Sequence, residues 1–149
     1  MNLEDYKLAF SKLRSDVQPY WSAATLHRAP HKPFLLLSIM DLIANNQVKS
    51  NFFELDAELM DTFDLYWEKI IGKDRESNIL MPFYHMTSEG FWHLVAVPGL
   101  EQALAAVGRI KSFRQFHQVA LGARLNDDLF ALFSEPDARD KLRRVLIEK

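Results

Sequence analysis

The apolar residues of this chain recur mostly with the spacing of an α-helix. From residue 3 to about 14 they lie three or four positions apart, which places them on one face of a helix. The segment from 33 to about 44 is apolar nearly all round, so we expect it to be the central buried helix, with Pro33 as its first residue. Spacing and capping residues predict further helices over 56–71, 100–107, 113–121, 126–133 and 134–149.

One region has the composition of β-structure instead. Residues 84–86 and 91–97 flank the short polar segment 87–90, and the second arm is rich in aromatic and β-branched residues. This arrangement predicts a β-hairpin. Together the elements predict one domain over residues 1–149, mainly α with a small β-hairpin, which is an α+β fold with a compact, winged-helix-like arrangement of helices.

The last predicted helix stops while its apolar stripe is still running. No glycine, proline or polar tail follows the stripe, which is formed by Ala138, Leu142, Val145 and Leu146. We therefore expect the chain to be the N-terminal part of a longer protein, cut at the edge of a domain.

Composition narrows the class of protein. A chain of 149 residues, 48% hydrophobic and 26% charged, can close one core. It contains no cysteine, which excludes disulfides and thiolate metal sites, and no apolar run near the roughly 20 residues that cross a bilayer. The N-terminus is charged and amphipathic and has no signal-peptide core. We expect a cytoplasmic protein with no membrane partner.

The formal net charge of −2 argues against a nucleic-acid partner, but the charges are unevenly distributed. No Asp or Glu occurs in the segments 17–40, 77–88 and 102–126, whereas acids gather in 54–68 and from 127 onward. The first acid-free segment holds His27, Arg28, His31 and Lys32, and the last holds Arg109, Lys111, Arg114, His117 and Arg124. This distribution indicates either one basic face on the folded chain or a chance clustering of charge.

Motifs for catalysis or for cofactors are not found in the sequence. His27 and His31 are four residues apart, but Pro30 between them disfavours the regular helix that a zinc-binding pair needs. There is no HExxH motif, no GxSxG elbow and no glycine-rich phosphate loop, and the chain has only five glycines. We therefore expect a binding domain that is not an enzyme by itself and that holds no metal and no cofactor.

Two segments are candidates for function. The segment HRAPHKPFLLL (27–37) carries His, Arg and Lys side chains on a proline-stiffened backbone, extended at Lys32, just before the central helix. This suits phosphate binding, although a loop whose cations lie in solvent would show the same pattern. The segment ILMPFYHM (79–86) places Pro82 at the mouth of the predicted hairpin, where its ring would be an exposed apolar surface beside Tyr84 and His85. The alternative is that these residues fill the core.

In their order along the chain, these segments resemble the DNA sulfur-binding domain of ScoMcrA-like (McrA/HNH-type) restriction endonucleases. The matching pieces are HRAPHKPFLLL (27–37), MPFYHMTSEGFWHL (81–94), a Lys-Ser-Phe-Arg stretch (111–114) and LGARLNDDLFALF (121–133), which span nearly the whole chain. The resemblance implies a bacterial defence protein that binds double-stranded DNA in which sulfur replaces a non-bridging phosphate oxygen. It also implies an HNH nuclease domain after this one in the full-length protein.

The resemblance implies roles for individual residues. His27 and Arg28 match positions beside the modified phosphate, and Pro82 matches a proline whose ring packs against the sulfur. Met81 stands where relatives carry an aromatic residue, which departs from the family pattern. The expected DNA-binding residues are His27, Arg28, His31, Lys32, Lys111, Ser112 and Arg114, and the expected walls of the sulfur pocket are Pro82, Tyr84 and His85.

Sulfur is larger and more polarizable than oxygen and is a poorer hydrogen-bond acceptor. An apolar pocket therefore gains dispersion and desolvation energy from sulfur, but it strips water from oxygen at a cost of about 1–3 kcal/mol. On this hypothesis the cations supply affinity for any DNA backbone and the pocket supplies the preference for phosphorothioate. Two other classes fit the same sequence: a general DNA-binding domain without sulfur preference, and a protein-interaction adaptor.

Overall fold

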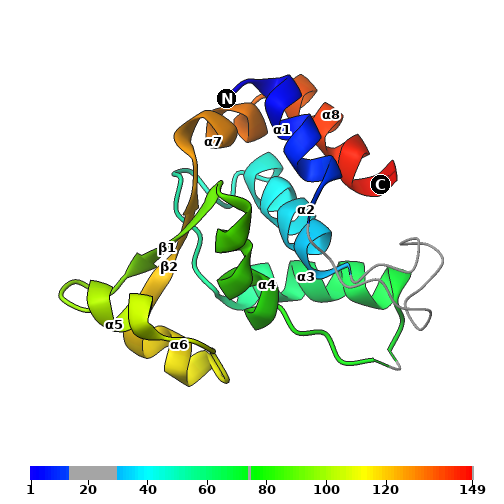
Figure 1. Ribbon diagram of the computed structural model, residues 1–149. Helices are drawn as coiled ribbons and strands as arrows, with labels where there is room; N and C mark the ends of the chain where they lie inside the picture. The colour runs from blue at the N-terminus through cyan, green and yellow to red at the C-terminus, as the bar shows by residue number, and fades with distance from the viewer. Residues whose placement is uncertain (14–29, 74, 149) are drawn as a thin grey trace.

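The computed structural model describes residues 1–13, 30–73 and 75–148 (Figure 1). These residues form helices and one two-stranded antiparallel sheet, which confirms the prediction of a mainly α, α+β fold; the winged-helix likeness is not confirmed. No helix among the described residues is both long enough and apolar enough to pass through a bilayer. The elements in chain order are α1 (Leu3–Ser11), α2 (His31–Ala44), α3 (Ala57–Ile70), α4 (Leu80–His85), the 3-10 helix η2 (Met86–Glu89), β1 (Trp92–Ala96), α5 (Glu101–Ala106), α6 (Phe113–Val119), β2 (Ala120–Leu125), α7 (Asp127–Ser134) and α8 (Pro136–Glu148).

Helix α2 is the centre of the core. It is buried on nearly every face, as its apolar pattern predicts, and it packs against α3, α4, α7 and α8. The helix begins at His31 rather than at Pro33, with Pro30 as its N-cap and a hydrogen bond of 2.9 Å from Phe34 N to the Pro30 carbonyl. Pro33 is thereby in the first turn, where a missing N–H is tolerated. The expectation of an extended backbone at Lys32 is wrong for this reason, because Lys32 is helical.

The predicted hairpin over 84–97 is also wrong. Its first arm is helical: Tyr84 and His85 end α4, and Met86 begins η2, after which Gly90 (φ 88°) turns the chain into β1. Helix α4 places Leu80 and Phe83, three residues apart, on one face that is buried in the core. Pro82 lies in the first turn of this helix, so its missing N–H does not interrupt the helix.

The partner of β1 lies almost thirty residues further along the chain. The pattern predicts a helix up to residue 121, but α6 stops at Val119 and the chain continues as β2. This strand pairs with β1 so that Trp92 is opposite Leu125. Phe53 extends this pairing through two backbone hydrogen bonds with Ala123, of 2.8 and 2.9 Å. A Cβ on Gly122 would collide with the carbonyl of Phe53, so this close approach requires glycine.

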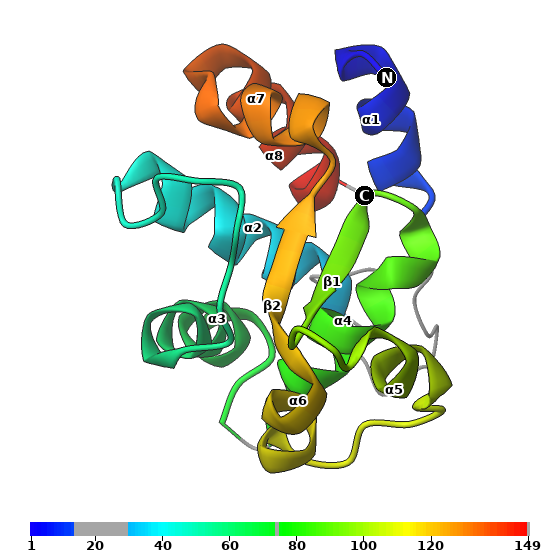
Figure 2. The ribbon, with the colours of Figure 1, turned by 90° about the vertical axis from the view of Figure 1, so that its left-hand side faces the viewer.

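The sheet connects two groups of helices (Figures 1 and 2). Helices α1, α7 and α8 pack together at one end of the sheet, and α5 and α6 lie at the other. Trp92 Nε1 donates a hydrogen bond of 2.8 Å to the Phe83 carbonyl, and the Phe83 ring meets Trp92 and Phe116 edge-on, with centroids 5.2 and 5.4 Å apart. Because Phe83 belongs to α4 and Phe116 to α6, these contacts hold the two helices in a fixed relation around β1.

Candidate nucleic-acid interface

A cavity of about 330 Å³ lies between α4 and the loop that precedes α6; we name it the α4–α6 cavity. It brings together Tyr84 and His85, two residues of the predicted sulfur pocket, with Lys111 and Ser112, two predicted DNA-binding residues. Two separate predictions therefore fall on one site. The described residues that line it are Asn78, Leu80, Met81, Tyr84, His85, Arg109, Ile110, Lys111, Ser112 and Phe113.

Hydrogen bonds fix the α4 wall of the cavity. Asn78 Oδ1 accepts a hydrogen bond of 3.3 Å from Met81 N, and Tyr84 OH donates one of 2.6 Å to the carbonyl of Val107. The rings of Tyr84 and His85 meet edge-on with their centroids 5.0 Å apart. The wall that results combines the apolar side chains of Leu80 and Met81 with the rings of Tyr84 and His85, and Met81 keeps 41% of its surface exposed.

The opposite wall is a short loop that Gln115 holds in place. Ser112 caps α6 by accepting a hydrogen bond of 3.1 Å from Gln115 N. The Gln115 side chain accepts a bond of 2.7 Å from Lys111 N and donates one of 3.4 Å to the Arg109 carbonyl. The loop backbone is thus fixed, whereas the side chains of Arg109, Lys111 and Ser112 remain exposed. No described residue accepts a hydrogen bond from the Ser112 hydroxyl, which can therefore donate to a ligand.

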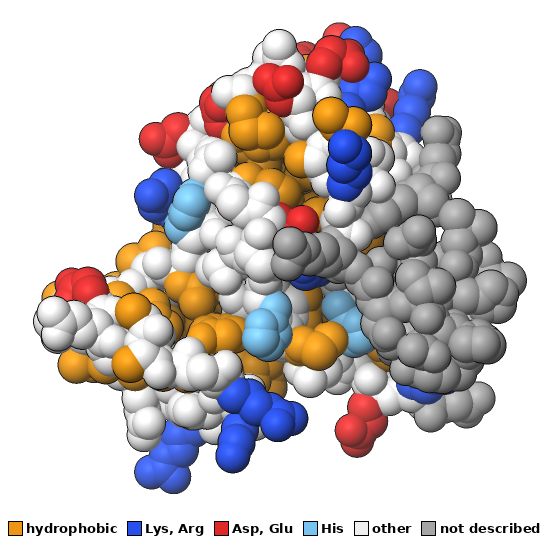
Figure 3. Space-filling model, in the orientation of Figure 1, with side chains coloured by type: hydrophobic (Ala, Val, Ile, Leu, Met, Phe, Trp, Pro, Cys, Tyr) orange, Lys and Arg blue, Asp and Glu red, His pale blue; other side chains and the backbone are white. Residues whose placement is uncertain are grey.

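The cavity has a positive rim. Arg109 and Lys111 line it, Arg114 follows on the first turn of α6, and none of the three forms an ion pair with a described residue. No acid is found among its described lining residues, because the acid-free segments 77–88 and 102–126 supply most of the two walls. Figure 3 shows Lys and Arg side chains gathered over α6 at the lower edge of this face, below hydrophobic and histidine side chains. The segregation of charge seen in the sequence is therefore also present in space.

A second hollow, between the end of α2 and the start of α3, has the opposite charge. Its volume is about 270 Å³, and its described lining includes Glu54, Asp56 and Glu58 together with Lys49. Carboxylates at this density repel phosphate. Of these two hollows, only the α4–α6 cavity suits a polyanion.

The structure places His31 and Lys32 where they offer little charge to a ligand. His31 is 9% exposed and packs on Trp67, with ring centroids 5.1 Å apart, and burial lowers its pKa to about 4. At pH 7 its ring is therefore neutral. Lys32 Nζ lies 2.5 Å from Glu89 Oε2, and the two side chains are 13% and 10% exposed, so the charge of Lys32 is already compensated. Both residues lie outside the lining of the α4–α6 cavity.

Pro82 differs most from its predicted role. Its ring was expected to be exposed, but the structure buries it in α4, and it is not among the lining residues of the cavity. Met81, the residue before it, lines the cavity instead. His27 and Arg28 lie outside the described residues.

Several lining residues were not predicted as site residues. Arg109 enters the sequence prediction for its charge alone, and Phe113 enters it as the start of a helix and as part of the Lys-Ser-Phe-Arg stretch (111–114), although 42% of the Phe113 surface is exposed. An exposed aromatic residue between Lys111 and Arg114 is a signal that sequence reasoning could have used.

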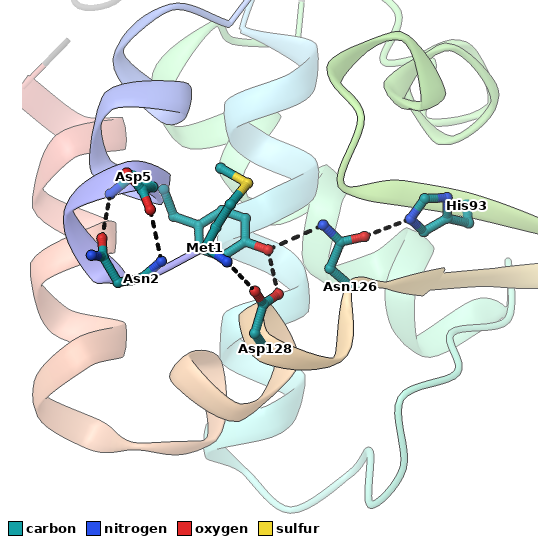
Figure 4. A network of polar contacts seen from close by, with 7 residues as sticks. Met1, Asn2, Asp5, His93, Asn126 and Asp128 are labelled. Carbon is teal, nitrogen blue, oxygen red and sulfur yellow. Dashed lines mark hydrogen bonds and ion pairs between the residues drawn. The ribbon is translucent and has the colours of Figure 1, made fainter.

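A network of polar side chains lies at the end of the sheet where α1 and α7 pack (Figure 4). Tyr6 OH donates to Asp128, and it accepts a hydrogen bond of 3.1 Å from Asn126 Nδ2. Asn126 Oδ1 lies 2.6 Å from His93 Nε2, and the N-terminal ammonium lies 2.8 Å from Asp128. Burial and the hydrogen bond to Asp128 raise the pKa of Tyr6 to about 12. These groups satisfy one another and join α1 to β1 and α7, so we assign the network a structural role.

The sequence matches no protein-family model, and it matches no curated protein. What the chain binds must therefore be inferred from the chemistry of the α4–α6 cavity.

Proposed function

We propose that this chain is a DNA-binding module without a catalytic centre of its own, and that the α4–α6 cavity contacts the backbone of double-stranded DNA at a phosphorothioate linkage. The observation that carries the proposal is the composition of the cavity. Apolar side chains in its walls and a rim of cations face one space, and no acid is found among its described lining residues. This combination suits a ligand that is anionic and partly apolar, as a phosphorothioate is.

The cations account for affinity. Arg109, Lys111 and Arg114 lie within six residues of one another, all exposed, on a backbone that Gln115 holds. Each phosphate that such a cation neutralises releases condensed counterions, so the logarithm of the binding constant falls by about 0.9 per contact for each tenfold rise in salt. If all three cations bind phosphates, they contribute a slope of about −2.7 to the salt dependence.

The apolar walls account for a preference for sulfur. The side chains of Met81, Tyr84 and Ile110 offer dispersion contacts but few hydrogen bonds. A phosphate oxygen placed against them loses water at a cost of about 1–3 kcal/mol, which sulfur largely avoids. We therefore expect the chain to bind the modified duplex about tenfold to a hundredfold more tightly than the unmodified one. This assigns to Met81 and its neighbours the contact that the sequence assigned to Pro82.

In the cell, this activity would serve as the targeting module of a modification-dependent restriction system. The chain would act in the cytoplasm, where bacterial DNA lies, and a nuclease domain of the HNH type in the full-length protein would perform the cleavage.

A second candidate function is DNA binding by the same cations without a preference for sulfur. The burial of Pro82 favours it, because the ring that the resemblance assigns to sulfur is withdrawn from the surface. The two functions share the cation rim and differ in the effect of sulfur.

The test compares one duplex with and without a single phosphorothioate linkage, in each stereochemical form, at two salt concentrations. The proposal predicts tighter binding of one stereoisomer at both salt concentrations. Equal affinity for all three duplexes would support the second candidate. No binding to any duplex, together with self-association in light scattering, would reject both and favour a protein-interaction adaptor.

A matched pair of variants locates the interface. Lys111→Ala should weaken binding to all duplexes equally, whereas Lys69→Ala, which removes an exposed lysine from α3, should change nothing. Met81→Ser should reduce the difference between modified and unmodified duplexes. Equal effects of the two lysine substitutions would exclude the α4–α6 cavity as the binding site.

A further inference from the structure

The α4–α6 cavity is larger than a contact with the DNA backbone requires. A water molecule occupies about 30 Å³ in the liquid, and a single sulfur or oxygen atom is of similar size. The cavity of about 330 Å³ instead lies within the range of about 300–1,000 Å³ that is typical of pockets for small-molecule ligands. One atom of a phosphorothioate would leave most of this space to water, so the cavity fits a larger group.

The apolar side chains of the cavity indicate what kind of group this is. Met81 and Phe113 line the cavity from opposite walls and are 41% and 42% exposed. Two large apolar side chains held open to water beside one cavity form a surface ready for a ligand. Nucleic-acid bases stack on aromatic side chains, and methionine sulfur makes favourable contacts with aromatic rings, often at their edges.

The polar groups of the cavity suit the edge of a base. Asn78 Oδ1 is engaged by Met81 N, while its amide group carries two N–H donors. The Ser112 hydroxyl has a hydrogen to donate, as described above. Two donors beside an apolar slot match the oxygen and nitrogen acceptors on the edges of bases. Arg109 and Lys111 at the rim would then bind the phosphate of the same nucleotide.

We propose that the α4–α6 cavity holds a nucleobase: a nucleotide beside the bound linkage turns out of the duplex, and its base stacks on Phe113 while its phosphate stays at the cationic rim. The inference rests on the proposed function and extends it from the backbone to the base. A base leaves the stack most easily where it is mismatched, so a mismatch beside the linkage should strengthen binding.

The first experiment measures the affinity of the full chain for three duplexes that share the phosphorothioate linkage. One is fully paired, one carries a mismatch at the neighbouring base pair, and one has an abasic site in place of that base. The proposal predicts that the mismatch strengthens binding by at least about tenfold and that the abasic site does not. If the mismatch has no effect, or if the abasic duplex binds as tightly as the mismatched one, the base does not enter the cavity.

The second experiment tests the stacking partner. Phe113→Ala should abolish the gain from the mismatch, Phe113→Trp should keep it, and Leu65→Ala, which shortens an exposed apolar residue on α3, should leave it unchanged. Phe113 is exposed, so its replacement does not open a hole in the core. A gain that survives in Phe113→Ala would overturn the assignment.

A third measurement separates this inference from the proposed function. Saturation-transfer NMR with deoxyadenosine monophosphate reports whether base protons contact the protein, independently of any duplex. Base-proton signals that are lost in Phe113→Ala, combined with no duplex binding, would support a nucleotide site and reject the proposed DNA function. Duplex binding with neither base-proton signals nor a mismatch effect would support the proposed DNA function and reject the nucleobase site.

Discussion

Replacing His31 tests whether the residue is a buried neutral ring rather than a cation offered to DNA. His31 is 9% exposed against Trp67, and burial lowers its pKa from 6.5 to about 4. His31→Phe keeps a ring in this place and removes the titration. The perturbation therefore changes how stability depends on pH more than it changes the packing.

The sign and size of the effect follow from the two pKa values. Above pH 6.5 the ring is neutral in both states. Between about pH 6.5 and 4 the unfolded chain binds a proton that the folded chain does not, so the free energy of unfolding falls as the pH falls. At 1.4 kcal/mol per pKa unit, this loss amounts to about 2.5 kcal/mol between pH 7.5 and 4.5. Below about pH 4 both states are protonated and the loss stops growing.

The assay is urea unfolding of the wild type and of His31→Phe across this pH range. All other groups titrate in both proteins, so their contributions cancel when the two curves are subtracted. The wild type should lose about 2.5 kcal/mol more than the variant between pH 7.5 and 4.5. NMR titration of the imidazole gives the pKa directly, and His31→Gln repeats the comparison if the phenylalanine variant does not fold. If the free energies of unfolding of the two proteins change equally with pH, or if the imidazole pKa is near 6.5, His31 is not a buried neutral ring.

Three further predictions concern charge, packing and the polar network. Lys111→Ala should reduce the salt slope of DNA binding by about 0.9, whereas Lys69→Ala should leave the slope unchanged. Affinities measured at three salt concentrations give the slope, and an unchanged slope in Lys111→Ala would argue against a phosphate contact. Gly122→Ala should destabilise the fold by about 1–3 kcal/mol, because the added methyl group meets the Phe53 carbonyl; urea unfolding measures this, and a neutral result would contradict the close approach. Tyr6→Phe should cost about 0.5–1.5 kcal/mol in the same assay, because it removes the part-buried hydrogen bonds of the hydroxyl with Asp128 and Asn126, and a loss near zero would mean that water replaces the hydroxyl.

Local periodicity was a good guide to the helices and a poor guide to the sheet. The apolar pattern of 33–44 predicts a buried central helix, and α2 is that helix. The aromatic and branched residues of 91–97 correctly indicate a strand, but the pairing of that strand depends on residues 120–125, which local rules cannot locate. The glycine at position 122 becomes meaningful only once Phe53 is known to lie beside β2. Because β2 is distant in the sequence, the local pattern of 84–97 predicts a hairpin where the structure pairs β1 with β2.

For the candidate site, too, the sequence predicts the local features but not those that depend on distant residues. The absence of acids from 77–88 and 102–126 is visible in the sequence, and it correctly marks the two segments that meet in the α4–α6 cavity. The states of individual cations are not visible, because they depend on tertiary neighbours. Lys32 is compensated by Glu89, fifty-seven residues away, and His31 is neutral because Trp67 and other core residues bury it. Charge patterning thus marks the segments that form the α4–α6 cavity, but it does not show which cations have ion-pair partners in the fold.

We propose that DNA binds at the α4–α6 cavity, and an NMR titration of the ¹⁵N-labelled chain with a phosphorothioate duplex tests this residue by residue. We expect the largest amide shifts in 78–85 and 109–114, the two walls of the cavity, and we expect an unmodified duplex to shift the same residues at higher concentration. Shifts centred on another face, or no shifts with either duplex, would contradict it.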